Sequence, residues 1–141
     1  MKRDRFFVGS LVLLAAACQG RGPAERAGGP RIALVLKTPN NPFFVDLQRG
    51  AEEAARRLEV RLVVQSPERE VDVEKQMQIV ENLVETGIAA LCIAPASAKG
   101  ILPALAKAQA ARIPIVVVDD EVDAAAAAAA GVRTHSYVGS D

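Results

Sequence analysis

Short aliphatic runs alternate along this chain with stretches of helical periodicity, and this alternation restricts the fold more than any other feature. The runs at 32–36, 88–93 and 115–118 are almost entirely aliphatic, as strands buried on both faces of a sheet must be. Strands separated by helices favour right-handed βαβ units and a parallel sheet covered on both sides. The sequence therefore predicts a doubly wound α/β domain, with the strand order 2-1-3-4-5 of a common fold of this type.

Capping residues mark the helices of this domain. Asn41 and Asp72 are suitable N-caps, and Pro42 fits the first helical position because its missing N–H would be unpaired there in any case. Apolar residues then recur at spacings of three and four, and Gly87 is placed to end the second helix. The other predicted elements are strands at 60–64 and 137–138 and a helix at 98–111.

Alanine is unusually frequent among the apolar residues. It accounts for 26 of the 141 residues, so the core of large side chains is smaller than an apolar content of 50% implies. Seven consecutive alanines at 124–130 favour a helix by propensity but offer no large side chain to anchor it. We expect a marginal surface helix or a loop insertion without a functional role at this position.

The N-terminus indicates the compartment in which the protein works. Lys2, Arg3 and Arg5 precede an apolar stretch at 6–17, which is typical of a secretory signal. The stretch is well short of the roughly 20 residues that span a bilayer. The sequence therefore predicts a signal peptide over residues 1–17 and export from the cytoplasm.

Cys18 directly follows this apolar stretch. The residues Leu14-Ala15-Ala16-Ala17-Cys18 are similar to a bacterial lipobox, after which Cys18 would carry lipid as the first mature residue. An ordinary signal peptide cut near Ala17 is the alternative. Residues 18–30 contain four glycines and two prolines and predict a flexible tether. We expect a globular domain over 31–141, anchored through Cys18 to a bacterial membrane in the periplasm or cell envelope.

Charge and chemical motifs exclude several classes of function. Without residues 1–17 the chain has 14 basic and 16 acidic residues, which offers no electrostatic footprint for nucleic acid. No Gly-rich phosphate loop follows the first strand, no cysteine–histidine spacing predicts a metal site, and His135 has no nucleophile beside it. We therefore expect no enzyme, no cofactor and no metal ion.

Two further features also fit a protein without catalytic chemistry. Cys92 lies in an apolar strand and is predicted to be a buried structural thiol. Asp119 and Asp120 are adjacent at the end of a predicted strand, where neighbouring side chains point to opposite faces. We therefore do not expect these two carboxylates to form an acid/base couple.

The segment from Lys37 to Phe44 is the candidate ligand site. It directly follows the first strand, and open α/β sheets bind small ligands at the carboxyl ends of their strands. Phe43 and Phe44 open the next helix there, and core packing alone does not require two large rings at such a place. The alternatives are that Asn41 is only a helix cap and that one phenylalanine belongs only to the core.

Four segments together carry a family resemblance. They are Asn40-Asn41-Pro42-Phe43-Phe44, Ile93-Ala94-Pro95, Ile113-Pro114-Ile115-Val116-Val117-Val118-Asp119 and Val138-Gly139-Ser140-Asp141. Through them, residues 31–141 resemble the N-terminal lobe of type I periplasmic sugar-binding proteins of the ribose-binding-protein-like group. The resemblance implies a two-lobed receptor that closes on a sugar and delivers it to an ABC permease. An extracytoplasmic sugar-sensing domain of a signalling receptor is the alternative.

The resemblance also implies a second lobe, so that residues 31–141 would form an incomplete domain, and it implies a role for each matching residue. Asn41 would bond ligand hydroxyls, while Phe43 and Phe44 would flank the sugar ring, whose C–H edges suit an aromatic face. Asp119 would accept charge-assisted hydrogen bonds from two hydroxyls. A merely solvated strand end is the alternative for Asp119.

Three residues depart from the family's pattern. Lys37 stands where a small polar residue is frequent, Ala94 replaces a frequent Asn, and Asp120 replaces a frequent Arg. The last change reverses a charge in the site, and Lys37 could supply the compensating positive charge. We therefore predict a Lys37–Asp120 pair lining the cleft. The expected solute is a sugar other than plain ribose, a polyol or an amino-bearing relative of these.

Overall fold

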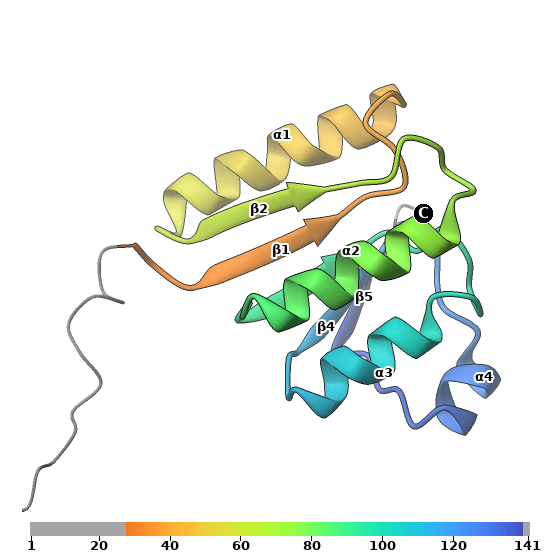
Figure 1. The fold of residues 1–141 in the computed structure, drawn as a ribbon. Helices are drawn as coiled ribbons and strands as arrows, with labels where there is room; N and C mark the ends of the chain where they lie inside the picture. Colours follow the sequence, from red (N-terminus) through yellow and green to blue (C-terminus); the bar gives the residue numbers. More distant parts are fainter. Residues whose placement is uncertain (1–27, 140–141) are drawn as a thin grey trace, which may run out of the picture.

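The sheet of this domain is built from five parallel strands (Figure 1). They are β1 (Arg31–Val35), β2 (Arg61–Gln65), β3 (Ala90–Ile93), β4 (Ile115–Val118) and β5 (Ser136–Val138). Their order in the computed structural model, which describes residues 28–139, is β2-β1-β3-β4-β5. The predicted fold class and strand order are therefore confirmed. The predicted signal peptide, Cys18 and most of the predicted tether lie outside the described residues.

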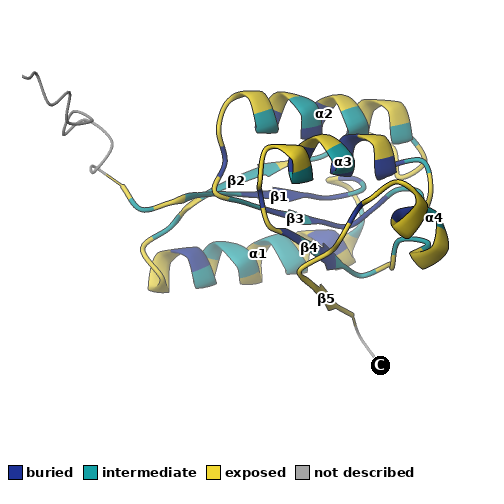
Figure 2. Cartoon of the chain, turned by 90° about the horizontal axis from the view of Figure 1, so that it is seen from below, coloured by how far each residue is buried: buried dark blue, intermediate teal, exposed yellow. Residues whose placement is uncertain are grey.

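Helices cover both faces of this sheet. They are α1 (Pro42–Arg57), α2 (Val73–Glu85), α3 (Leu102–Ala110) and α4 (Ala124–Ala129). Figure 2 shows α1 on one face, with α2 and α3 together on the other and α4 beside α3. A large apolar core lies under α2 and α3, and a smaller one lies under α1. Within residues 28–139, no helix is long and apolar enough to cross a membrane.

The predicted caps are present at both long helices. Asn41 Oδ1 accepts a hydrogen bond from Phe43 N at 3.0 Å, and Asp72 Oδ1 accepts one from Lys75 N at 3.1 Å. Each bond satisfies a backbone N–H group that the first helical turn otherwise leaves unpaired. Gly87 follows α2 with a φ of 77°, a left-handed conformation that favours glycine at the end of a helix.

The third helix begins later than the sequence predicts. Residues 98–101 form a turn in which Ser97 Oγ accepts a hydrogen bond from Gly100 N at 3.0 Å, and α3 starts at Leu102. Pro103 lies at the first helical positions, where its missing N–H costs no intrahelical hydrogen bond. The predicted start at residue 98 is therefore wrong, because Pro103 marks the beginning of the helix rather than an early interior turn.

A single buried amide fastens the carboxyl ends of two strands to α2. Gln76 is fully buried, and its Nε2 donates to Leu36 O at 3.1 Å and to Ala94 O at 2.9 Å. Its Oε1 accepts a hydrogen bond from Ala96 N at 2.8 Å. Leu36 and Ala94 directly follow β1 and β3, so this side chain satisfies backbone groups where two neighbouring strands end.

Cys92 is half-buried in β3. It packs against the smaller core, and burial raises the pKa of its thiol, which keeps it protonated at neutral pH. The predicted strand position of Cys92 is confirmed, but the predicted burial is found only in part. The reason is that α1 is the only described helix on this face of the sheet (Figure 2).

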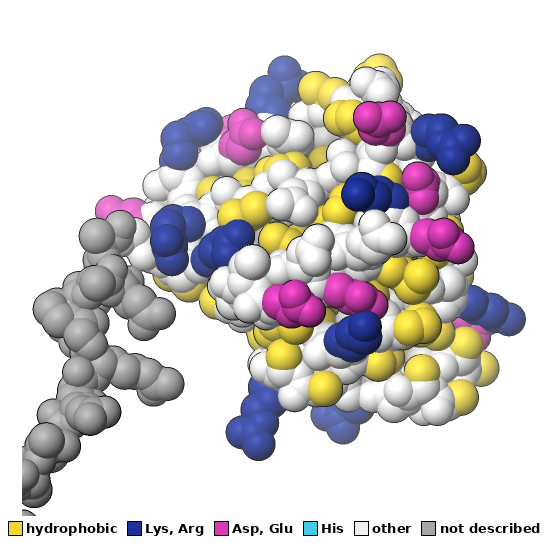
Figure 3. Space-filling view, viewed as in Figure 1, with side chains coloured by type: hydrophobic (Ala, Val, Ile, Leu, Met, Phe, Trp, Pro, Cys, Tyr) yellow, Lys and Arg dark blue, Asp and Glu magenta, His cyan; other side chains and the backbone are white. Residues whose placement is uncertain are grey.

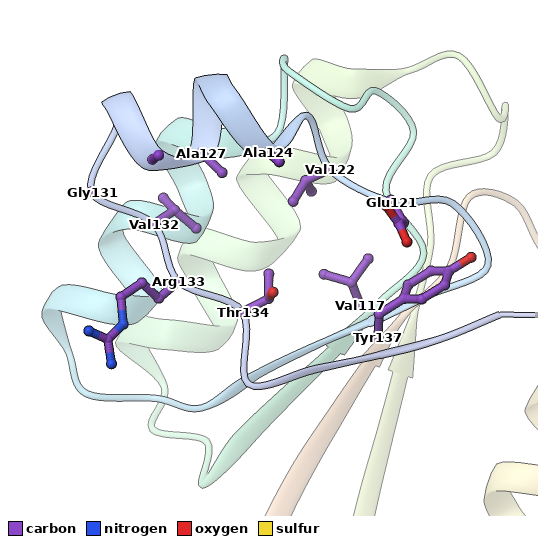
Figure 4. Close-up of a pocket in the computed structure, with 11 residues that line it drawn as sticks. Val117, Glu121, Val122, Ala124, Ala127, Gly131, Val132, Arg133, Thr134 and Tyr137 are labelled. Carbon is purple, nitrogen blue, oxygen red and sulfur yellow. The ribbon is translucent and has the colours of Figure 1, made fainter.

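The alanine run forms a short helix over a cavity. Asp123 Oδ1 caps α4 by accepting a hydrogen bond from Ala126 N at 2.8 Å, and Ala127 is the buried residue of the helix. Methyl groups leave space between α4 and the sheet, and a cavity of about 640 Å³ lies there, with Val117 and Tyr137 on its sheet side (Figure 4). The predicted marginal helix is thus present, and its lack of a functional role stays a prediction.

We predict that Gln76→Leu lowers the free energy of unfolding by roughly 3 kcal/mol, because buried backbone groups lose their hydrogen-bond partner. Chemical denaturation followed by circular dichroism measures this change. Gln78→Leu, on the exposed face of the same helix, is the matched control and should change stability by less than about 0.5 kcal/mol. Equal losses in the two variants would contradict the structural role of Gln76.

Candidate functional site

The predicted site residues lie together at the carboxyl edge of the sheet. The strands are parallel, so the loops that follow β1, β3 and β4 leave the sheet on the same side. Direct contacts connect the residues in one series, from the cap of α1 through an aromatic pair to a group of charges. They are Lys37 after β1, Asn41, Phe43 and Phe44 at the start of α1, and Asp119 and Asp120 after β4.

Lys37, Asp119 and Asp120 form an ion cluster at this edge. Lys37 Nζ lies 3.0 Å from Asp119 Oδ2 and also bonds Asp120 Oδ2. The Lys37 side chain is 12% exposed, that of Asp119 is 26% exposed and that of Asp120 is 67% exposed, so the cluster extends from the interior to the surface. The predicted Lys37–Asp120 ion pair is therefore present, and Asp119 joins it, whereas its place in a ligand cleft stays a prediction.

Both carboxylates reach the same ammonium because of the backbone conformation of Asp119. β4 ends at Val118, and Asp119 follows with a left-handed φ of 70°. The expectation that Asp119 and Asp120 point to opposite faces is therefore wrong, because it assumed that both residues continue the strand. The left-handed residue turns the chain instead, and both side chains face Lys37.

The ion cluster raises the pKa of Lys37. Burial is the largest single influence and lowers the pKa, but hydrogen bonds and Coulombic attraction to Asp120 and Asp119 together outweigh it. The folded protein therefore binds this proton more tightly than the unfolded chain does. The stabilisation is fully present below the ordinary lysine value of 10.5 and is lost as the pH rises through the raised value of the folded state.

The two phenylalanines differ sharply in exposure. Phe44 is 2% exposed and belongs to the core under α1, whereas Phe43 is 46% exposed. Their rings meet edge to face with centroids 5.2 Å apart, and Lys37 Nζ lies 5.7 Å from the centroid of Phe44. Phe43 thus offers an aromatic surface to solvent, supported from within by Phe44. The core position of Phe44 leaves little of its ring free for a ligand. Contact between Phe44 and a ligand stays a prediction.

Asn41 makes a second polar contact besides its cap. Its Nδ2 donates to Glu70 Oε1 at 2.8 Å, and Glu70 lies in the loop between β2 and α2. Thr38 Oγ1 donates to Glu68 O in that same loop at 3.0 Å. Two hydrogen bonds therefore fasten the loop after β1, which carries most of the site, to the loop after β2.

Three residues that support the site were not identified from the sequence. They are Glu70, Gln76 and Tyr137, whose Oη donates to Asp119 O at 2.7 Å. A signal existed for Gln76, because it lies seven positions before the buried Leu83 and therefore on the same helical face. No local pattern marks the other two, since each acts on a residue distant in the sequence.

The charges on the surface are mixed in sign. Figure 3 shows basic and acidic side chains side by side on the face in view, with no continuous basic patch. Among residues 28–139, no group of three or more His, Cys, Asp or Glu side chains could hold a metal ion.

We predict that Lys37→Met lowers the free energy of unfolding at neutral pH by about 1 kcal/mol, because it keeps the apolar stem but leaves two carboxylates without their cation. Denaturation of the wild type above pH 10.5 should show a loss of stability that is missing in this variant. Lys75→Met, at an exposed lysine of α2, is the control and should retain the loss. Identical pH profiles of Lys37→Met and the wild type would contradict this role.

Known proteins share this sequence pattern. Residues 32–141 match the family model described as a periplasmic binding protein domain. The chain is 40% identical over 104 residues to the D-ribose/D-allose-binding protein of Pseudomonas aeruginosa, covering 71% of this chain and 32% of that protein. It is 30% identical over 137 residues to the D-allose-binding periplasmic protein of Escherichia coli, covering 97% and 42% respectively.

The fold is shared with solved structures as well. An ABC transporter periplasmic solute-binding protein from Actinobacillus succinogenes with bound D-allose superposes with a TM-score of 0.75 at 39% identity, over 79% of this chain and 39% of that chain. The chain thus spans less than half of the length of each of these relatives. All three relatives are named as binding proteins, so the prediction of a non-enzymatic protein is confirmed at the level of the family. The predicted resemblance is confirmed too, and the chain belongs to the periplasmic binding protein domain family.

Proposed function

We propose that this protein is a lipid-anchored solute-binding protein that captures a sugar or polyol for an ABC-type importer. Three relatives support the class of solute, because they are named for D-ribose or D-allose or contain bound D-allose. Family membership supports a location in the periplasm or cell envelope. The solute, the permease and the anchor are all parts of this proposal.

The observation that carries the proposal is the convergence of the six site residues at one edge of the sheet. A sugar needs hydrogen-bond partners around its rim and an apolar surface against its ring. The oxygen and nitrogen atoms of Asp119 and Asn41 are the hydrogen-bonding groups, and the exposed ring of Phe43 is the apolar surface. These groups lie on one side of this domain, and their proximity supports a sugar site there.

The ion cluster fits a neutral solute better than an anionic one. Lys37 already interacts with two carboxylates, so the three side chains together carry one negative charge. Glu70 adds a further carboxylate beside Asn41. An acidic sugar would meet repulsion here, whereas the hydroxyls of a neutral sugar can donate to the carboxylates in charge-assisted hydrogen bonds.

Site variants test the proposal. We expect isothermal titration calorimetry of the full-length protein with D-allose, D-ribose and a panel of polyols to detect binding of at least one neutral solute. Phe43→Ala should weaken that binding about tenfold through loss of the ring surface. Val45→Ala removes another exposed apolar side chain of α1 and should leave the affinity unchanged.

A second variant pair tests the acidic group. Asp119→Asn should weaken the same solute about tenfold because a neutral amide is the poorer acceptor for hydroxyls. Glu121→Gln changes a nearby exposed carboxylate in the same way and serves as the control. Absence of binding by every sugar and polyol in the panel would refute the proposal, as would equal effects of the paired variants.

The anchor is tested at Cys18. We expect the wild-type protein to sediment with bacterial membranes and to be labelled by a radioactive fatty acid, because a lipid on Cys18 holds it there. Cys18→Ser should appear in the soluble fraction without label. Cys92→Ser removes the other cysteine and should fractionate like the wild type. A lipid-free wild type would show that an ordinary signal peptide precedes the domain.

A further inference from the structure

β5 holds the backbone of Asp119 from two sides. Tyr137 Oη donates to Asp119 O at 2.7 Å, and Asp119 N donates to Val138 O at 2.9 Å. The first bond comes from a side chain and the second continues the ladder between β4 and β5. The carbonyl and the amide of one site residue are therefore both fixed by a strand that supplies none of the predicted ligand contacts.

Asp119 needs such fixing because its conformation is uncommon. Its φ of 70° lies in the left-handed region, which residues other than glycine adopt rarely, although aspartate tolerates it better than most. This conformation brings the carboxylates of Asp119 and Asp120 to the same side of Lys37. An extended backbone at this position would separate them.

Gly139 makes room for the phenol. A Cβ atom at this position would lie 2.1 Å from Tyr137 Oη and 2.5 Å from its Cζ, far inside van der Waals contact. Any side chain at residue 139 would therefore force the ring of Tyr137 to move. Glycine at this position thus permits the observed position of the phenol through its missing side chain and not through its backbone angles.

The remaining surroundings of Tyr137 constrain the ring weakly. It is 45% exposed and borders the cavity under α4, where small alanine side chains leave the space unfilled. Figure 4 shows the ring near Val117, with its hydroxyl pointing toward the loop that follows β4. The hydrogen bond to Asp119 and the gap at Gly139 therefore determine where the ring lies.

We propose that Tyr137 is a positioning residue of the sugar site, which holds Asp119 in the conformation that presents its carboxylate, and that Gly139 provides the room for it. The inference rests on the proposed function, because it assigns Tyr137 a part in solute affinity. Tyr137 acts through Asp119 and does not itself touch the solute. Strand β5 thus contributes to the site without contributing a ligand contact.

A double-mutant cycle tests the proposal with D-allose as the calorimetric probe on the full-length protein. Tyr137→Phe removes only the hydroxyl and should weaken binding about two- to tenfold, the range of one hydrogen bond. Gly139→Ala should weaken it at least as much by displacing the phenol. Both changes break the same contact. The double variant should therefore bind D-allose with the same affinity as the single variant that binds it less tightly. Ser136→Ala, at a neighbouring exposed residue of β5, should bind like the wild type.

A readout without solute separates this inference from the proposed function. The pKa of Lys37, followed by NMR of labelled lysine side chains, is raised in the wild type and should move toward the ordinary lysine value in Tyr137→Phe but not in Ser136→Ala. If the wild type binds no sugar, the proposed function fails and this titration still decides the role of Tyr137. An unchanged Lys37 pKa in Tyr137→Phe, or multiplicative losses of affinity in the cycle, would overturn the proposal.

Discussion

The amide of Gln76 is the interaction on which the arrangement of the site depends. Where parallel strands end, their last backbone groups leave the ladder and need other partners. Gln76 supplies partners for Leu36 and Ala94 from inside the core, and no buried side-chain nitrogen or oxygen in the described residues lacks one. Leu36 directly precedes Lys37. The hydrogen bond from Gln76 to Leu36 therefore fixes the backbone next to the ion cluster. The group that makes this bond is a neutral amide, which costs less free energy to bury than a charge.

The site combines a rigid support with charged groups of graded exposure. Phe44 and the stem of Lys37 are enclosed, whereas Phe43 and Asp120 reach solvent. A buried anchor limits the rotamers of the group above it, so a solute of the proposed kind would cost little conformational entropy on binding. The backbone of the site is restricted as well, because side-chain hydrogen bonds join the loop after β1 to the loop after β2. The side chains and loops at this edge of the sheet are therefore largely fixed by contacts within the domain itself.

Sequence reasoning succeeded where the information is local. The caps at Asn41 and Asp72 and the end of α2 at Gly87 depend on residues within one helical turn, and the aliphatic strands on a pattern of a few residues. The Lys37–Asp120 pair was predicted from the reversal of charge at Asp120 relative to the family's pattern. The joint orientation of the two aspartates was missed because the left-handed backbone of Asp119 depends on β5, which lies 18 residues further along the chain. Hydrogen bonds between residues so far apart in the chain leave no periodic pattern in the sequence.

The alanine helix α4 has a thermodynamic consequence of its own. Alanine side chains have no rotamers to freeze, so this segment gains little from packing and loses little entropy when it orders. Its folding equilibrium is then governed mainly by the Asp123 cap and by the few backbone bonds of a six-residue helix. We expect residues 124–129 to exchange their amide hydrogens through local opening, long before the parallel sheet beneath them unfolds. Helix α4 can thus unfold and refold locally while the carboxyl edge of the sheet keeps its structure.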